Sequence, residues 1–491
     1  MCPTDPDTSP PRRQTARRSG EAAIFDLDRT LVARSTGTVF QRHLRAHGFG
    51  GERDLPGAAT LYSFFNRVGE SGLTMRLVRM GVRAVRGWSA KAVTAAANDA
   101  ADELVADVLP YAALTVEDHR AHGRDLVLAT TSPHALVAPL AERLGFDHVV
   151  ATRWEEHDGA FTGALDGRFV WGRGKLLAVR ELAAEAGIRL DRSWAYSDSY
   201  YDAPLLAAVA HATAVNPDGR LAVLARLQGW PVRHFDVPEG VVKIAGREIQ
   251  AWLRPLAIEA MIPNARVEIT GLDNIPAAGP AILAFNHRSY FDISVVGMAV
   301  AKSGRSARGI GKKEVFDAPL IGPVMRAFGG IRVDRGTGSD EPLQAAEVAL
   351  RAGELVIIAP QGTIPRGPAF FDPEMKGRWG TARLAQRTGT PVIPMGLWGT
   401  EEVWPRNQRL PSMSLDGPRP VVTATIGPPV ELGGSDVDDD TRRIMTAIAD
   451  LLPAEARQRR VPTDEELART YPPGYSGEPG RERDRRPGTN T

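Results

Sequence analysis

Cysteine is almost absent from this sequence, and long hydrophobic runs are missing altogether. Cys2 is the single cysteine among 491 residues, which excludes an intrachain disulfide and a zinc site built from cysteines. No run approaches the roughly 18 consecutive apolar residues that a membrane-spanning helix needs, and residues 1–20 lack the apolar core of a signal peptide. We therefore expect a protein of the reducing cytoplasm.

An excess of charge of one sign is also lacking. The 60 lysines and arginines nearly balance the 59 aspartates and glutamates, which leaves a net charge of +1. A dedicated nucleic-acid-binding protein usually has a strong basic excess, so we expect no nucleic-acid partner. The 43% of hydrophobic residues is ordinary for globular domains and sufficient for a sizeable core in each.

The chain contains two blocks in which strand-like and helix-like segments alternate. This alternation predicts βαβ units with parallel sheets, and therefore the α/β fold class for both blocks, with a Rossmann-like sheet in the first. We place the first block at 21–235 and the second at 263–455. Residues 36–118 interrupt the first block and are typical of helices, so they would form a cap over the ends of the strands.

The segments outside the two blocks have a different composition. We expect residues 1–20 and 456–491, which are rich in proline and charge, to be disordered tails. Residues 236–262 include IQAWLRPLAIEAMI, which indicates a connecting helix or a segment that dips into a bilayer interface. Within the predicted cap, residues 64–88 place five arginines among apolar residues, a pattern that fits either a solvated helix face or an anionic membrane surface.

Acidic residues follow the first predicted strand at its carboxyl end. Asp26 and Asp28 are two residues apart, so both carboxylates can emerge on one side of an extended segment. Such a pair can divide the work of phosphoryl transfer, because one carboxylate can attack phosphorus while the other handles protons. Phosphate and carboxylate are both anionic, so a cation such as Mg²⁺ must screen them. The groups that would complete this site are Thr130, Lys175, Asp198 and Asp202.

These motifs, in the order DxDxT, strand-terminal threonine, GK opening a helix and SDSxxD, resemble the haloacid dehalogenase superfamily. The long helical insertion is similar to that of its phosphoserine-phosphatase-like branch. The resemblance implies a phosphomonoester substrate, with Asp26 as the nucleophile that forms an aspartyl-phosphate and Asp28 as the general acid and base. It also implies that Thr130 and Lys175 hold the phosphoryl group. The implied Mg²⁺ ligands are Asp26, the carbonyl of Asp28 and Asp198, with Asp202 as a ligand or a neighbour of the ligands.

A histidine and an aspartate follow a strand-like run in the second block. His287 directly follows AILAFN and could act as a general base near neutral pH. Asp292, five residues later, could hold the imidazole in one tautomer and stabilise its protonated form. No nucleophilic serine or cysteine motif accompanies the pair, so the base would act directly on a substrate hydroxyl. Flexible glycines lie beside cations and free backbone amides further along, in GGIRVDR, with Arg332 and Arg335, and in PQGT, with Gln361, Gly362 and Thr363.

The NHx₄D motif, the glycine–arginine motif, the PxGT loop and the later Pro394 in VIPMG resemble the glycerolipid acyltransferases, most closely the 1-acylglycerol-3-phosphate acyltransferases. The resemblance implies that His287 deprotonates the hydroxyl of lysophosphatidate, which then attacks the thioester of acyl-CoA or acyl carrier protein. Asp292 would orient His287. The implied glycerol-phosphate ligands are Arg332, Arg335, Gln361, Gly362 and Thr363. The family's third motif usually reads EGTR, and here Gln361 replaces its acid and Ile364 its cation.

Together the two resemblances predict a bifunctional enzyme of phospholipid metabolism. It would bind Mg²⁺ and act at the inner face of the cell membrane, held there peripherally by an anionic lipid surface. An alternative hypothesis makes the second block a non-catalytic docking domain that carries the phosphatase to membranes.

Overall fold

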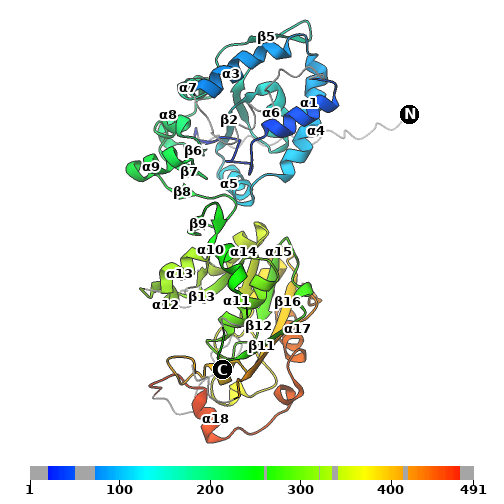
Figure 1. The fold of residues 1–491 in the computed structure, drawn as a ribbon, viewed down its shortest axis with the longest axis vertical. Helices are drawn as coiled ribbons and strands as arrows, with labels where there is room; N and C mark the ends of the chain where they lie inside the picture. Colours follow the sequence, from blue (N-terminus) through cyan, green and yellow to red (C-terminus); the bar gives the residue numbers. More distant parts are fainter. Residues whose placement is uncertain are drawn as a thin grey trace, which may run out of the picture. The chain divides into compact units, whose positions relative to one another are not determined.

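A computed structural model describes most of the chain, which divides into two compact units, Met1–Val237 and Pro238–Thr491 (Figure 1). Each unit is an α/β structure with its own sheet, which confirms the predicted fold class. No helix of the described segments is both long and apolar enough to cross a membrane. The described residues are 20–49, 72–258, 262–319, 321–333, 341–412 and 418–475.

The first unit is built on a six-stranded sheet in the order β3-β2-β1-β6-β7-β8, in which every neighbouring pair is parallel. Its central strand β1 is buried on both faces, as expected for a parallel sheet covered by helices on each side. The strands are β1 (Ala22–Phe25), β2 (Asp125–Pro133), β3 (His148–Thr152), β6 (Trp194–Ser197), β7 (His211–Val215) and β8 (Val232–Arg233).

The insertion between β1 and β2 is helical in its described parts. Helix α4 begins at an N-cap, where Ser89 accepts a hydrogen bond from the backbone of Ala92. Its many alanines allow close packing against α1 and α6. The helices of this unit are α1 (Gly37–Ala46), α3 (Gly72–Gly81), η1 (Val82–Val85), α4 (Ala90–Ala106), α5 (Pro110–Ala121), α6 (His134–Arg143), α7 (Arg173–Ala186), α8 (Ala203–Leu206) and α9 (Gly219–Gln228), and β4 (Trp154–His157) pairs with β5 (Ala160–Leu165).

The second unit is built on a seven-stranded sheet in the order β11-β17-β16-β12-β15-β13-β14. Only the pair β16–β17 is antiparallel. The strands are β11 (Arg266–Thr270), β12 (Ala281–Phe285), β13 (Ala307–Lys312), β14 (Ile331–Val333), β15 (Leu355–Ile358), β16 (Val392–Trp398) and β17 (Val421–Ile426).

Apolar clusters cover both faces of this second sheet. On β12, Leu283 and Phe285 pack with residues of α11, whereas Ile282 and Ala284 pack with residues of α14, α15 and α17 on the opposite face. The uninterrupted apolar run AILAF follows from this two-sided burial. The helices are α11 (Asp292–Lys302), α12 (Lys313–Asp317), α13 (Ile321–Ala327), α14 (Glu341–Arg351), α15 (Gly380–Thr388), α16 (Thr400–Val403), α17 (Val437–Asp450), η7 (Gly367–Phe370), η8 (Ala454–Arg457) and α18 (Asp464–Arg469).

Residues 236–262 differ from the single connecting helix that the sequence suggested. Two short antiparallel strands flank Ala245 and Gly246, which both have positive φ, as in the tight turns that hairpins favour. The helix that follows is short, and Pro255 lies just after it, where the missing N–H prevents a longer α-helix. The elements are β9 (Lys243–Ile244), β10 (Arg247–Glu248), α10 (Ile249–Leu253) and η4 (Arg254–Leu256).

A buried arginine ties this hairpin to the second sheet. Arg308 on β13 is 1% exposed, and its guanidinium donates hydrogen bonds to Glu248 of the hairpin at 2.7 Å and to Glu354 at 3.0 Å. The side chain of Gln250 also exchanges two hydrogen bonds with the backbone of Ala307. The hairpin is therefore an integral part of the second unit.

The chain from 456 to 475 also differs from the disordered tail expected there. Helix α18 begins with a capping box formed by Thr463 and Glu466. After it, Thr470 and Tyr471 are buried, 3% and 6% exposed. Composition alone gave no sign that this polar stretch could pack, because its order depends on contacts with residues about 100 positions earlier, such as the hydrogen bond from the Gly367 amide to Thr470.

Candidate active sites

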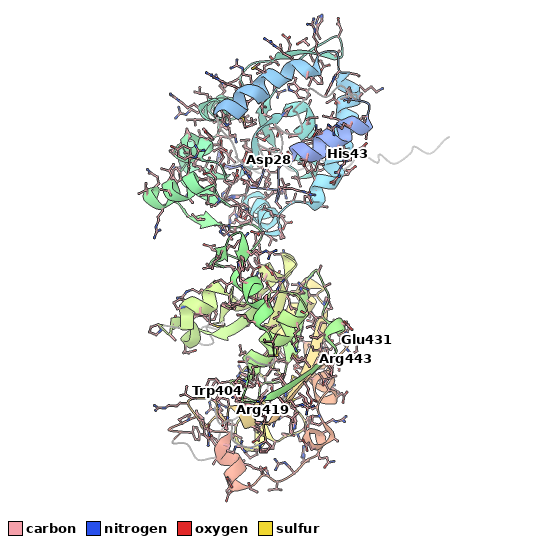
Figure 2. The ribbon with its side chains drawn as sticks, viewed as in Figure 1. Asp28, His43, Trp404, Arg419, Glu431 and Arg443 are labelled. Carbon is pink, nitrogen blue, oxygen red and sulfur yellow. The ribbon has the colours of Figure 1, made fainter. Side chains whose placement is uncertain are left out.

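The acidic pair of the first unit lies where β1 ends. The amide of Asp26 donates to the carbonyl of Tyr196 on the neighbouring strand β6 at 2.9 Å, which places Asp26 beside the carboxyl end of that strand. Asp28, labelled in Figure 2, lies in the first unit. Its carboxylate accepts a 2.6 Å hydrogen bond from the amide of Thr36, the N-cap residue of α1. The backbone of Asp26 is thus fixed by the neighbouring strand, and the carboxylate of Asp28 is fixed by the start of α1.

Burial changes the proton affinity of both carboxylates. It raises the pKa of Asp26 to about 7, an effect that Lys175 opposes and the nearby Asp202 reinforces. The pKa of Asp28 is also raised by burial, although the hydrogen bond from Thr36 lowers it in part. Asp28 can therefore carry a proton nearer neutral pH than an exposed aspartate, as a general acid requires.

Lys175 bridges two of the predicted carboxylates. Its Nζ lies 2.9 Å from Asp26 Oδ1 and 2.6 Å from Asp202 Oδ2, and its side chain is 4% exposed. Ser197 Oγ donates to the same oxygen of Asp202 at 2.7 Å. The lysine points inward from the first turn of α7, which begins after Gly172, where φ is +54°.

The two remaining predicted residues lie at the ends of β2 and β6, the strands on either side of β1. Thr130 near the end of β2 is 2% exposed, and its Oγ1 accepts a hydrogen bond from the amide of Ser132. Asp198 directly follows β6 and is 3% exposed; its Oδ2 lies 2.7 Å from Nε of Arg29, a residue with positive φ in the turn after Asp28. Asp198 is thus paired with Arg29.

The donor chemistry of this site suits a hard divalent cation. Asp26, Asp198 and the carbonyl of Asp28 offer oxygen ligands of the kind that Mg²⁺ prefers. Within the described ranges, no cluster of three or more His, Cys, Asp or Glu side chains is arranged around a common point. Asp202 is engaged by Lys175 and Ser197, and Asp198 by Arg29.

In the second unit, the histidine and aspartate of NHx₄D are in direct contact. His287 Nδ1 lies 2.7 Å from Asp292 Oδ2, and the two side chains are 20% and 0% exposed. The same oxygen accepts hydrogen bonds from the amides of Arg288 and Ser289. Because an ionised carboxylate only accepts hydrogen bonds, Nδ1 carries the proton and Nε2 is left as the basic nitrogen.

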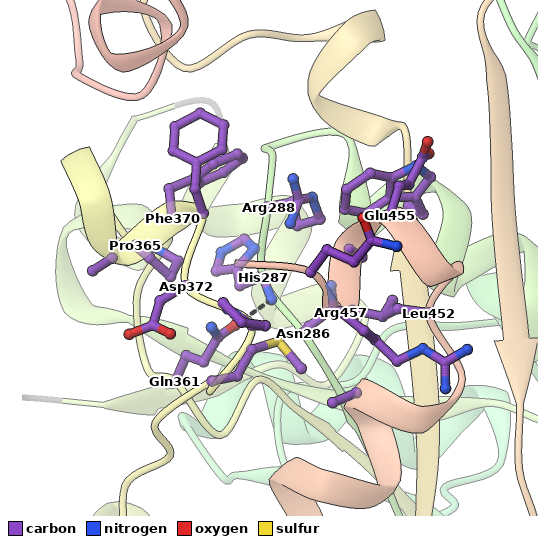
Figure 3. A pocket seen from close by; sticks show the side chains of 18 of the residues that line it. Asn286, His287, Arg288, Gln361, Pro365, Phe370, Asp372, Leu452, Glu455 and Arg457 are labelled. Atoms are coloured by element: carbon purple, nitrogen blue, oxygen red, sulfur yellow. Dashed lines mark hydrogen bonds between the residues drawn. The ribbon is translucent and has the colours of Figure 1, made fainter. Parts of the chain in front are cut away.

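Two amide side chains hold the end of β12 in place. Gln361 Oε1 accepts a 2.7 Å hydrogen bond from the backbone amide of His287 (Figure 3). Asn286 bonds both the amide and the carbonyl of Leu397 on β16, at 2.7 and 2.9 Å. Asn286 was not among the predicted site residues; its position between the apolar strand and the histidine was the signal that could have identified it.

A narrow pocket opens at His287 (Figure 3). Arg288 lies in its wall between the rings of Phe370 and Trp398, 4.4 and 4.2 Å from their centres, and pairs with Glu401. The pocket combines aromatic walls with charged side chains, several of them from the end of the described chain. Its principal charged and polar lining residues are Asn286, His287, Arg288, Gln361, Asp372, Glu455, Arg457, Gln458 and Arg460.

Of the remaining predicted acceptor ligands, the three that the structure describes, Arg332, Gly362 and Thr363, do not line the pocket at His287. Arg332 lies on β14, three strands and about 14 Å of sheet from β12, and it faces Asp317 at 3.4 Å. Arg335 lies outside the described residues. Gly362, with φ of +71°, and Thr363 continue the loop from Gln361, but only Gln361 lines the pocket.

Comparison with known proteins assigns both units. A family model for haloacid dehalogenase-like hydrolases matches residues 23–207, and one for acyltransferases matches residues 266–398. A phosphoserine phosphatase of Mycobacterium tuberculosis is 36% identical over 241 residues, 48% of this chain and 77% of that protein. The inhibition of morphological differentiation protein of Streptomyces azureus is 37% identical over 220 residues, 44% of this chain and 79% of that protein.

Among solved structures, the 1-acyl-sn-glycerophosphate acyltransferase of Thermotoga maritima is 22% identical, with a TM-score of 0.31, over 41% of this chain and 76% of its own. The two family matches confirm the two resemblances found in the sequence. The chain therefore belongs to the haloacid dehalogenase-like hydrolases, and it carries an acyltransferase domain C-terminal to its phosphatase domain.

Proposed function

We propose that the chain is a bifunctional enzyme: an Mg²⁺-dependent phosphomonoester hydrolase and a 1-acylglycerol-3-phosphate acyltransferase. The observation that carries the proposal is the presence in one chain of two assembled sites. One contains the Lys175 bridge between Asp26 and Asp202, and the other contains the 2.7 Å contact between His287 and Asp292.

In the phosphatase, Lys175 holds Oδ1 of Asp26, and the other carboxylate oxygen attacks phosphorus. The bond from phosphorus to the leaving oxygen breaks, and Asp28 donates its proton to that oxygen. Asp28 then accepts a proton from the water that hydrolyses the aspartyl-phosphate and releases Asp26. Bound Mg²⁺ would supply charge that offsets the repulsion between carboxylate and phosphate, with Asp26, Asp198 and the Asp28 carbonyl as its ligands.

In the acyltransferase, Nε2 of His287 takes the proton of the acceptor hydroxyl while that oxygen attacks the thioester carbonyl of acyl-CoA or acyl carrier protein. The carbon–sulfur bond then breaks, and the proton passes from the imidazolium to the leaving thiolate. Asp292 stabilises the imidazolium, because its buried carboxylate lies against Nδ1.

Product analysis tests both activities together. The purified chain is incubated with lysophosphatidate, acyl-CoA and Mg²⁺, and the lipids are identified by mass spectrometry. Phosphatidate supports acyl transfer, and diacylglycerol supports a phosphatase that acts on the acylated product. Phosphate release from phosphoserine or an aryl phosphate, without release from phosphatidate, would separate the phosphatase from the lipid pathway.

A docking role for the second unit is the other candidate function, and the altered third motif favours it. Gln361 and Ile364 replace the usual acid and cation, and Ile364 is only 2% exposed. If wild type and His287→Ala both fail to transfer an acyl group from any donor, the docking function is the correct one.

We also propose that the second unit contacts an anionic membrane surface, which supplies its insoluble acceptor. The hairpin and helix at its start expose apolar side chains beside Lys243, Arg247 and Arg254, a combination suited to a lipid interface. Sedimentation with anionic but not with zwitterionic vesicles is expected, and equal recovery with both would contradict the role of charge. The exposed apolar residues are Val242, Ile244, Trp252, Leu253, Leu256 and Ile258.

A further inference from the structure

The third acyltransferase motif of this chain has Ile364 in place of its cation. Arg366, two residues later, lies 5.7 Å from the centre of the Tyr475 ring and does not line the pocket at His287. Ile364 is 2% exposed, so its side chain is packed inside the unit. Its carbonyl accepts a 2.6 Å hydrogen bond from Arg406, which lies buried behind the loop. An anionic acceptor at His287 therefore needs a cation from another element.

The end of the described chain passes over the pocket at His287. We call residues 453–475 the C-terminal strap. Glu455 of the strap accepts a 2.9 Å hydrogen bond from Trp398, and Thr470 accepts one of 2.8 Å from the Gly367 amide. Arg469 pairs with Glu402 at 2.7 Å. These contacts fix the strap at three points. Its residues Glu455 and Arg457 line the pocket (Figure 3).

Three arginines line this pocket, and two of them are already engaged. Arg288 pairs with Glu401 and is held between two aromatic rings. Arg460 pairs with Glu466 at 2.8 Å. Arg457 of the strap is exposed, and no carboxylate of the described chain lies within ion-pair distance of it. Arg457 is thus the pocket cation that is available to a ligand.

Arg457 and His287 line the same pocket. An acceptor whose hydroxyl lies at His287 therefore has the strap as one wall of its site, with the charge of Arg457 in that wall.

On the basis of the acyl-transfer function proposed above, we propose that Arg457 binds the anionic phosphate monoester of the acyl acceptor, in place of the cation that the third motif lacks. A guanidinium suits this role because it forms paired hydrogen bonds with phosphate oxygens. Arg457 is then a specificity-determining residue, and the strap is part of the acceptor site.

The test compares Arg457→Gln with Arg459→Gln as a matched control. Arg459 lies in the same strap and does not itself line the pocket; its partner Asp372, 3.6 Å away, does, so this control also reports the effect of another change of charge at the pocket wall. Acyl transfer is measured with lysophosphatidate and with uncharged monoacylglycerol. For Arg457→Gln we expect KM for lysophosphatidate to rise roughly tenfold at similar kcat, the effect of losing one charged hydrogen-bond contact. KM for monoacylglycerol should not change, and Arg459→Gln should match wild type with both acceptors.

Other outcomes overturn the proposal. These are an unchanged KM for lysophosphatidate, an equal change for both acceptors, or a change confined to KM for acyl-CoA, which would place the donor's phosphates at Arg457. Unfolding curves that match wild type exclude a folding defect, and Arg457→Lys should restore part of the lysophosphatidate affinity.

Direct binding separates this proposal from the proposed function. Titration calorimetry with glycerol 3-phosphate needs no turnover, so it applies even if wild type transfers no acyl group. Weaker binding to Arg457→Gln than to wild type and Arg459→Gln supports the phosphate site. Equal binding to all three proteins, or no binding to any, overturns it.

Discussion

The two candidate active sites differ in the sequence separation of the residues that interact within them. Lys175 and Asp26 are 149 residues apart in sequence and 2.9 Å apart in space, whereas His287 and Asp292 meet within one turn at the start of α11. The first site therefore exists only when a whole sheet is assembled, and it concentrates several buried charges. The second depends on a local pair, which distant residues hold in position.

Replacement of the nucleophile should have the largest effect, and it should separate the two activities. We expect Asp26→Asn to lower phosphate release from an aryl phosphate by roughly 10⁴-fold or more, because the amide cannot attack phosphorus. Acyl transfer should stay at the wild-type rate, since His287 and its partners all belong to the second unit. His287→Ala is the reciprocal control; loss of both activities in either variant would mean that the sites depend on each other.

Removal of the bridging lysine should change both rate and pH dependence. In Lys175→Met the phosphatase rate should fall by about 100-fold. Lys175 lowers the pKa of Asp26 against the effect of burial, so without it the pKa of Asp26 should rise above 7. The acid limb of the profile of kcat/KM against pH should then move to higher pH by about one unit.

The matched control for this variant is Arg173→Met, an exposed position in the same turn of α7. It should leave the profile where it is in wild type. An unshifted acid limb in Lys175→Met would show that Asp26 does not control that limb.

A substitution in the local pair of the second site should have a smaller effect than loss of the nucleophile in the first. Asp292→Asn should lower acyl transfer by about 100-fold, because an amide NH₂ facing Nδ1 of His287 favours the wrong tautomer and cannot stabilise the imidazolium. The surface variant Asp439→Asn, which disturbs only ion pairs on α17, should keep the wild-type rate. A similar loss in both variants would argue against a specific role for Asp292.

The smallest expected effect concerns Gln361. Gln361→Leu removes the acceptor for the His287 amide, so kcat should fall by roughly tenfold. Gln361→Glu restores both the acceptor oxygen and the residue usual in the family, and it should stay within about threefold of wild type. If the glutamate variant is as slow as the leucine variant, the hydrogen bond to the backbone is not what this position contributes.

The α/β class of both units could be predicted from the sequence, because apolar strands alternating with helices leave few other arrangements. The motif residues of the first site could also be predicted, because DxDxT and SDSxxD lie at the ends of β1 and β6, which pair in parallel. The contact between His287 and Asp292 needed only their spacing along the chain.

Other features depend on contacts between distant residues. The position of Arg332, three strands from β12, follows from the strand order of the finished sheet. The strap is ordered through tertiary contacts such as that of Thr470 with Gly367, which its polar composition does not reveal. The hairpin at the start of the second unit likewise depends on the buried Arg308.

That arginine has a practical consequence for anyone who wishes to prepare the acyltransferase by itself. Arg308 would lose Glu248 if the protein were cut at residue 263, where the family resemblance begins, and a guanidinium that is 1% exposed would keep only one of its two carboxylates. A recombinant fragment beginning at Pro238 retains both carboxylates and should therefore be the more stable of the two.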